Sequence, residues 1–289
     1  MKIGSHVSTR NGYFGAAQQT VRLGGKAFQY FPKNPRSLTV KSFDHQDANN
    51  CARFCQEHGL VSIAHTAYPT NLSEADDAMR RVMMASIAND LEIAEACGSI
   101  GVVVHFGKYK GADPLMGYTL MINMLNQILR DWEGSALVLI ENNAGQGAKM
   151  GITFEELVQI RKLSAYPEKI GFCLDTCHAF ASGLWNGSNW PALVEKGTEL
   201  GYFPHLKAVH LNDSMHESSS YRDRHANVGK GYIGEASMRG FLQSPVIREM
   251  PVILETPSSA SYTHQVEIAY VHSLAEVNEG NAKKGRQRQ

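Results

Sequence analysis

The sequence lacks a long apolar run, an excess of either charge and an apolar leader. No stretch of about 18 apolar residues occurs in the 289 residues, which predicts a protein without a membrane-spanning helix. Lys and Arg together number 28, as do Asp and Glu, so the bulk charge does not indicate a polyanionic partner. The N-terminal segment MKIGSHVSTRNG has no apolar core of the kind found in signal peptides. Export and membrane insertion are therefore not expected.

The cysteines are few and odd in number, and they do not form a CxxC pair. Four of the five fall in two pairs, Cys51 with Cys55 and Cys173 with Cys177, each separated by three residues. This usage predicts free thiols in a reducing cytoplasm. The last residues, 279–289, are polar and basic, which predicts a disordered tail. No break in composition divides residues 1–278, so they are expected to form one domain.

Short apolar runs recur along the chain at intervals of about 25 to 40 residues. We expect eight strands, at residues 2–7, 27–31, 61–67, 100–107, 136–142, 169–175, 206–213 and 251–256. The runs are apolar on both faces, as parallel strands covered by helices are. Eight such strands alternating with helices predict a single (β/α)8 TIM barrel. The same alternation also fits a doubly wound sheet, which stays open at this point.

The helical stretches between these strands begin with recognisable caps. Ser73 is expected to cap the helix that runs to Gly98. Asp113 precedes Pro114 at the start of the next helix, as an N-cap before a first-turn proline. Thr153 stands three residues before Glu156, which is the spacing of a capping box.

Six of the eight runs end in a residue that can bind a metal ion: His65, His105, Glu141, Asp175, His210 and Glu255. The residue two positions earlier is apolar in each case: Ile63, Val103, Leu139, Cys173, Ala208 and Ile253. Since side chains two apart share one face of a strand, all twelve would point the same way. If that way is into a barrel, the six polar residues meet at its C-terminal mouth. The intervening residues are apolar too, so the pattern leaves the facing open.

Each of these residues also has an ordinary structural interpretation. A single histidine at a strand end is usually a satisfied polar group, and Asp175 could simply cap the helix that holds His178. Together, three carboxylates and three imidazoles at one barrel mouth would carry a large desolvation cost without a cation. Neutral imidazole and carboxylate suit zinc and similar divalent ions. His178 and the pair Asp223 and His225 add three further candidate ligands.

Five longer segments carry a specific resemblance. They are IENNAGQG (140–147), CLDTCHAFASG (173–183), VHLNDS (209–214), DRHANVGKG (223–231) and ILET (253–256). In content and order they are similar to the endonuclease IV family of apurinic/apyrimidinic endonucleases, over nearly the whole chain. The resemblance implies a cytoplasmic, monomeric DNA repair enzyme with three zinc ions, acting on duplex DNA. Such an enzyme cleaves 5′ to an abasic site and leaves a 3′-hydroxyl and a 5′-deoxyribose phosphate.

The resemblance also implies roles for single residues. His65, His105 and Glu141 would hold the first zinc, and Glu141 would also bind the second. Asp175, His210 and Glu255 would complete the second site, and His178, Asp223 and His225 would hold the third. Glu141 and Glu255 would flank the attacking water, so both are catalytic candidates. Cys173 and Cys177 would serve packing.

Two loops resemble the segments with which the family reads DNA. Arg36 in FPKNPRSL (31–38) and Tyr68 in AYPTNL (67–72) would probe the abasic gap. Departures from the family pattern occur at Pro69, Phe106 and Lys230, and no ligand is lost. Cations are expected on the same rim, where phosphates would bind: Lys33, Arg36, Lys108, Lys110, Lys149, Arg222, Arg224 and Lys230.

Two other functions stay open from the sequence. A metal-dependent sugar isomerase or epimerase would use a similar barrel, with fewer metals and a pocket for a free sugar. A binding protein without catalysis would normally lack a ligand, and all nine candidates are present. The third group, His178 with Asp223 and His225, argues against the isomerase.

Overall fold

Eight parallel strands close into a barrel in the computed structural model, which describes residues 1–276. Around the barrel they follow the order β1, β10, β7, β6, β5, β4, β3, β2. Their bounds are β1 Lys2–His6, β2 Ala27–Tyr30, β3 Val61–His65, β4 Gly101–His105, β5 Leu137–Glu141, β6 Ile170–Asp175, β7 Leu206–His210 and β10 Pro251–Leu254. All eight runs expected from the sequence are barrel strands, and closure excludes the doubly wound sheet.

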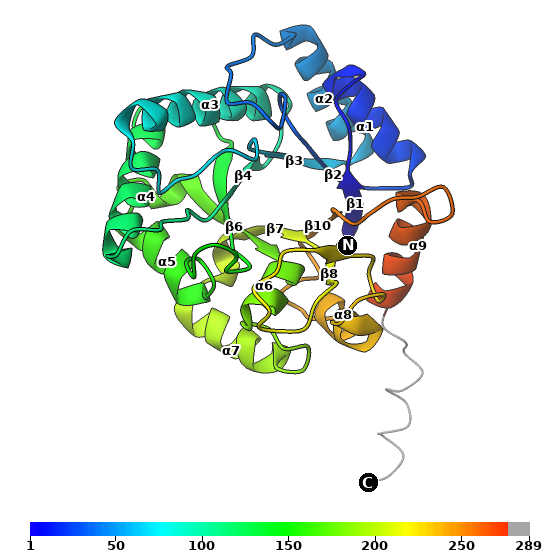
Figure 1. Cartoon of the computed structure of the whole chain (residues 1–289). Coiled ribbons are helices and arrows are strands. Elements are labelled where there is room, and N and C mark those ends of the chain that lie inside the picture. Colours follow the sequence, from blue (N-terminus) through cyan, green and yellow to red (C-terminus); the bar gives the residue numbers. More distant parts are fainter. Residues whose placement is uncertain (277–289) are drawn as a thin grey trace.

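Helices surround the strands, and the short helix at residues 176–182 lies inside the ring that the others form (Figure 1). They are α1 Gly12–Arg22, α2 His45–His58, α3 Asp77–Ala96, α4 Pro114–Leu129, α5 Phe154–Leu163, α6 Thr176–Ser182, α7 Trp190–Leu200, α8 Gly234–Leu242 and α9 His264–Ala275. Short 3-10 turns, η1 Pro167–Lys169 and η2 Phe203–His205, lead into β6 and β7. A small antiparallel hairpin, β8 Asp213–Ser214 with β9 His225–Ala226, stands above β7.

The inside of the barrel holds a separate small core. It consists of Ala27, Ile63, Val103, Leu139, Cys173, Ala208 and Ile253, all buried. Six of these are the apolar residues two positions before the candidate ligands. The sequence left their facing open, and the structure turns them inward. The polar residues at the strand ends therefore lie above this layer, at the C-terminal mouth.

Two of the three expected caps are confirmed, and one is wrong. The Asp113 side chain accepts a hydrogen bond from the Leu115 amide at 3.0 Å, and Thr153 forms a capping box with Glu156. Helix α3 begins at Asp77, four residues after Ser73, and Asp76 caps it by accepting from the Met79 amide at 2.8 Å. Asn71 explains the delay, because its amide binds both the carbonyl and the amide of Lys108 and holds this segment over the mouth as a loop.

Three other expectations concern the remainder of the chain. All five cysteines are buried free thiols, as expected. Among residues 1–276, none of the helices combines the length and the apolar character needed to span a bilayer. The tail predicted at residues 279–289 lies outside the described residues, as do the last two residues of the domain predicted at 1–278.

Candidate metal centre

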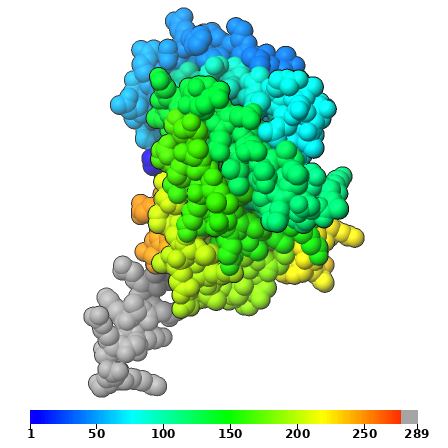
Figure 2. Space-filling model, turned by 90° about the vertical axis from the view of Figure 1, so that its left-hand side faces the viewer, coloured from blue at the N-terminus to red at the C-terminus, as the bar shows by residue number. Residues whose placement is uncertain are grey.

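Nine candidate ligands converge above the barrel's inner core. His65, His105, Glu141, Asp175 and His210 are the last residues of their strands, and Glu255 directly follows β10. Helix α6 contributes His178, while Asp223 and His225 come from the segment after β8, which is yellow and projects at the right-hand edge of Figure 2. They fall into three groups in which one donor atom from each residue lies within 4.8 Å of the others. The groups are the same sets that the sequence resemblance implied.

The first group is His65, His105 and Glu141. The Nε2 atoms of the two imidazoles lie 3.5 and 3.3 Å from Oε2 of Glu141. Nδ1 of His65 donates to the Thr66 carbonyl at 2.8 Å, because a carbonyl can only accept. This hydrogen bond leaves the lone pair of Nε2 free and pointed at the group. Orientation of a ligating histidine through its other nitrogen is the usual arrangement at a metal site.

The second group shares Glu141 with the first and adds Asp175, His210 and Glu255. Nδ1 of His210 lies 2.9 Å from Glu141, 3.3 Å from Glu255 and 3.9 Å from Asp175. All four side chains are at least four-fifths buried, and Asp175 and His210 are fully enclosed. Glu141 therefore stands where one carboxylate can bridge two cations.

The third group lies beside the second. Nε2 of His178 and Nε2 of His225 each lie 3.2 Å from a different oxygen of Asp223. His225 is also 3.7 Å from Asp175, which links this group to the second. Asp175 does cap α6, because it accepts from the His178 amide at 2.7 Å. Its other oxygen faces the second group, so capping and ligation do not exclude each other.

The unpartnered atoms of this cluster fit a cation. Among the described residues, Oε2 of Glu141 and Nε2 of His225 are buried and have no hydrogen-bond partner. Buried polar atoms are rarely left unpaired, because an unmade hydrogen bond costs about 1–3 kcal/mol. Both atoms face a group of other candidate ligands. Divalent ions that prefer nitrogen and oxygen donors would satisfy them.

The protonation states give the same indication. Burial alone would raise the pKa of Glu141, but His210 and His105 hold that pKa well below its ordinary value. Burial would also raise the pKa of Asp223, which His178 holds far below its ordinary value. Burial opposes the charge on His225 as well, yet Asp223 and Asp175 raise its pKa to about 9. Without metal, protonated imidazoles thus balance carboxylates that stay ionised, and bound cations would take over that role.

Cys177 belongs to the wall of the site. Its sulfur lies within 4.8 Å of donor atoms of Asp175 and His225. The thiol donates to the Arg224 carbonyl at 3.7 Å, and burial raises its pKa to about 12. A neutral thiol that is already donating is a poor ligand, which supports the packing role expected for it.

Two amide side chains in this network were missed by the sequence analysis. Gln29 donates to Glu255 at 2.6 Å and accepts from Nε2 of His210 at 2.6 Å. Asn212 donates to Asp175 at 2.7 Å and to Glu255 at 3.2 Å. Both had a signal in the sequence. Gln29 is a polar residue inside an apolar strand, and Asn212 lies two positions after His210, on the same face.

Comparison with known proteins identifies the family. Residues 17–279 match the model of a family described as a xylose isomerase-like TIM barrel. The chain is 43% identical to "Probable endonuclease 4" of Symbiobacterium thermophilum, over 95% of this chain and 99% of that protein. The crystal structure of endonuclease IV from Thermus thermophilus superposes with a TM-score of 0.82 at 30% identity, covering 95% of this chain and 98% of the other.

The chain belongs to the endonuclease IV family. It is therefore a hydrolase of the nuclease type. A D-tagatose 3-epimerase-like protein also superposes, with a TM-score of 0.70 over 98% of this chain and all of the other. At 18% identity that likeness shows the fold alone.

The two loops expected to read DNA lie together at the mouth of this endonuclease IV barrel. The Tyr68 amide donates to the Pro35 carbonyl at 2.8 Å, which ties the loop of Tyr68 to that of Arg36. The Tyr68 ring packs edge-on against Phe31 at 5.2 Å between centroids and remains 62% exposed. Arg36 is exposed. Both loops are thus anchored through their backbone at the edge of the cleft.

One of the expected rim cations is not on the rim. Lys33 is buried, and its ammonium lies 2.9 Å from Asp90 and donates to the Ser86 carbonyl at 2.6 Å. Both partners belong to α3, so Lys33 anchors the loop that carries Arg36. The expectation of a solvent-exposed Lys33 was wrong, because a loop position alone does not show which way a long side chain folds.

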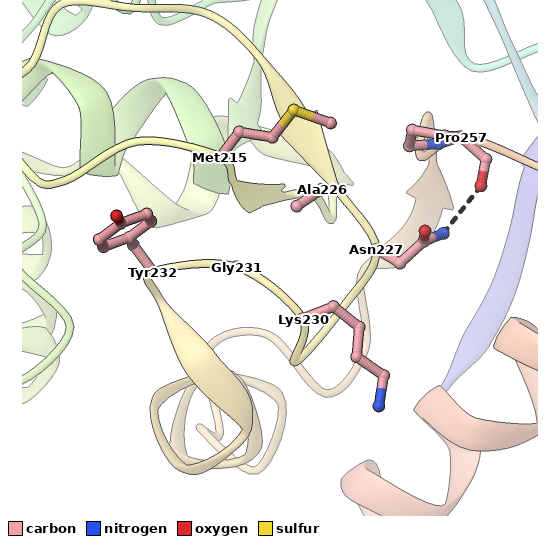
Figure 3. A pocket seen from close by; sticks show the side chains of 7 residues that line it. All are labelled: Met215, Ala226, Asn227, Lys230, Gly231, Tyr232 and Pro257. Atoms are coloured by element: carbon pink, nitrogen blue, oxygen red, sulfur yellow. Dashed lines mark hydrogen bonds between the residues drawn. The ribbon is translucent and has the colours of Figure 1, made fainter.

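A hollow lies on the rim, where Ala226 follows His225 of the third group. It has a volume of about 550 Å³ and is lined by Met215, Ala226, Asn227, Lys230, Gly231, Tyr232 and Pro257 (Figure 3). The Asn227 amide donates to the Pro257 carbonyl at 2.8 Å and so joins the two loops that flank it. Lys230 and Tyr232 are exposed there. Lys230, a departure from the family pattern, thus presents an exposed cation at this hollow.

Proposed function

We propose that this endonuclease IV relative hydrolyses the phosphodiester 5′ to abasic sites in duplex DNA, with three zinc ions at the nine-ligand centre. The observation that carries the proposal is the sharing of Glu141 between two ligand groups, with a third group linked to them through Asp175. Bound divalent ions lower the pKa of water and neutralise charge on phosphoryl oxygens. In the reaction, an oxygen of water bonds to phosphorus and the bond from phosphorus to the 3′-oxygen breaks.

The protein's own side chains have three tasks in this reaction. Glu141 and Glu255 remain ionised and set the negative charge of the site, since facing imidazoles hold the pKa of Glu141 well below its ordinary value. Burial would raise the pKa of Glu255, but His210 keeps it at about 2. Gln29 and Asn212 each hold one oxygen of Glu255, which fixes the carboxylate plane. Arg36 and Tyr68 occupy the space from which the base is missing.

Cleavage of a defined duplex tests the proposal. The substrate is a duplex of about three helical turns with one abasic site, and the control is the same duplex without a lesion. We expect a single cut with a 3′-hydroxyl on one fragment and a 5′-deoxyribose phosphate on the other. An enzyme that cuts both duplexes equally, or neither, would contradict abasic specificity.

A sugar isomerase is the less favoured function. The epimerase-like structure shares the fold, but the present chain places the group of His178, Asp223 and His225 beside the two other ligand groups at the barrel mouth. Three cations at the mouth suit a phosphodiester, whose reaction spreads charge over several oxygens.

Replacement of Arg36 or Tyr68 by alanine is expected to reduce recognition of the lesion. Each variant should keep its full metal content and bind abasic duplex about 1–3 kcal/mol less tightly, the range for loss of one stacking contact. Undamaged duplex should bind almost as before, because only the lesion leaves a gap to fill. Fluorescence anisotropy with both duplexes measures the difference. Equal losses on the two would show that these residues contact only the backbone.

Lys230→Glu serves as the contrasting rim variant. Its charge reversal should weaken binding to abasic and undamaged duplex alike, because a phosphate contact is independent of the lesion. The salt dependence of binding should become shallower by about one unit in slope for each lost phosphate contact. Titrations at several salt concentrations give this slope. A loss confined to abasic duplex would instead place Lys230 at the lesion.

A further inference from the structure

A chain of hydrogen bonds beside the metal centre fixes the orientation of the Gln29 amide. Gln29 is fully buried on β2, between Glu255 and His210. The atom that faces Oε1 of Glu255 at 2.6 Å must be the NH2 group, because an ionised carboxylate only accepts. The Gln29 carbonyl oxygen then accepts from Nε2 of His210 at 2.6 Å, which leaves Nδ1 of His210 facing the second group.

The same amide determines which nitrogen of His6 carries the proton. The Gln29 NH2 group lies 3.2 Å from Nδ1 of His6. An amide NH2 can only donate, so Nδ1 accepts and the proton of the imidazole resides on Nε2. A doubly protonated ring could not accept this bond. Burial agrees, since it lowers the pKa of His6 to about 4.

The free nitrogen of His6 reaches the substrate cleft. The ring is held against Phe31 at 4.6 Å between centroids. His6 lines the same cleft of about 420 Å³ as His65, Tyr68 and Glu255. Among the described residues, Nε2 has no hydrogen-bond partner, and it is not one of the buried unpaired atoms. A neutral N–H donor is therefore available in the space where the DNA strand would lie.

We propose that His6 is a further substrate-binding residue, which donates from Nε2 to a non-bridging phosphate oxygen of the DNA strand, and that Gln29 is the positioning residue that fixes its tautomer. This inference rests on the proposed function. Strand β10 lies between β1 and β7 in the barrel, so His6 approaches the cleft from the side of Glu255 away from His210. Every nucleotide of the DNA strand carries a phosphate group, whose oxygens are strong acceptors for this N–H donor.

The neutral charge of His6 separates it from the rim lysines. A cation that contacts phosphate releases a counterion, so its loss changes the salt dependence. A neutral donor contributes a hydrogen bond to a charged group and leaves the salt slope unchanged. Loss of one such bond corresponds to roughly ten- to hundredfold in affinity.

Three substitutions at His6 test which atom matters. A glutamine amide nitrogen reaches about as far as Nε2, an asparagine nitrogen only as far as Nδ1, and phenylalanine has no donor. Single-turnover cleavage of the abasic duplex, at increasing enzyme concentration, gives the half-saturating concentration. We expect it to rise at least about tenfold in His6→Phe and His6→Asn, with an unchanged salt slope, and to stay within about threefold in His6→Gln. His58→Phe, at an exposed histidine on α2, is the matched control.

The tautomer itself is tested without DNA. In zinc-loaded protein with 15N-labelled histidine rings, the His6 signals should show the Nε2–H form near neutral pH. Gln29→Leu should abolish this preference. Gln29 also contacts the candidate ligands His210 and Glu255, so elemental analysis must show that the variant still holds its zinc. An Nδ1–H form in the wild type would overturn the positioning role of Gln29.

The cleavage results separate the two proposals. A wild-type enzyme that cuts the abasic duplex, with His6→Phe within about twofold of it in half-saturation, would overturn the role of His6 alone. A wild-type enzyme that does not cut would overturn the proposed function. A changed salt slope in His6→Phe would show that the residue acts as a cation, which contradicts the neutral donor.

Discussion

Glu255→Gln is expected to reduce turnover at least about a thousandfold, about 4 kcal/mol of barrier. Both carboxylate oxygens face donors, Oε1 the Gln29 amide and Oε2 the Asn212 amide. A glutamine side chain has one acceptor oxygen, so its NH2 group must oppose one of these donors. It also removes a negative charge 3.3 Å from His210 in the second group. Single-turnover rates on the abasic duplex measure the loss.

The control for this variant is Glu235→Gln, at an exposed position of α8, where the carboxylate accepts a hydrogen bond from Arg239 at 2.8 Å. That change should leave the rate as it is. Glu255→Gln should still melt cooperatively and bind abasic duplex, because the other three ligands of the second group remain. A rate within about tenfold of the wild type, roughly 1.4 kcal/mol, is incompatible with a catalytic Glu255.

Removal of the metal is expected to abolish cleavage and to lower the melting temperature by at least about 5 °C. A ligand that binds only the folded state stabilises it by about 2.7 kcal/mol at a hundredfold excess over its Kd, and three sites add their effects. Elemental analysis of protein purified without chelator should give three zinc ions per chain. Calorimetry before and after chelation measures the stability, and zinc addition should restore both properties.

The third group offers an internal control for the metal count. Asp223 belongs only to this group, whereas Glu141 and Asp175 each belong to two groups of candidate ligands. Asp223→Asn should therefore retain two ions, and Glu141→Gln should disturb two sites at once. A single ion per chain in fully active wild-type protein would contradict the three-metal centre.

The sequence alone predicted the barrel, which the structure confirms, and nine candidate ligands, which the fold brings together at one mouth. Strands with two buried faces leave a continuous apolar signal, and six of them ended at a polar residue that broke it. Local capping could also be read at Asp113 and Thr153, because those bonds span only two or three residues. The motif from Cys173 to Gly183 holds Asp175 and His178 at a spacing that a helix N-terminus fixes.

Only the tertiary structure decided the facing, the anchoring of the loops and the tautomers. Ile63 and Ile253 point inward because the sheet closes, which a period of two cannot show. Ser73 does not cap α3, because Asn71 binds Lys108 and keeps this segment in a loop. Asn71 and Lys108 are 37 residues apart in the chain. Lys33 is buried because Asp90 lies across from it on α3. The protonation of His6 depends on Gln29, whose own orientation depends on Glu255, 226 residues further on, and contacts so distant in sequence exist only after folding.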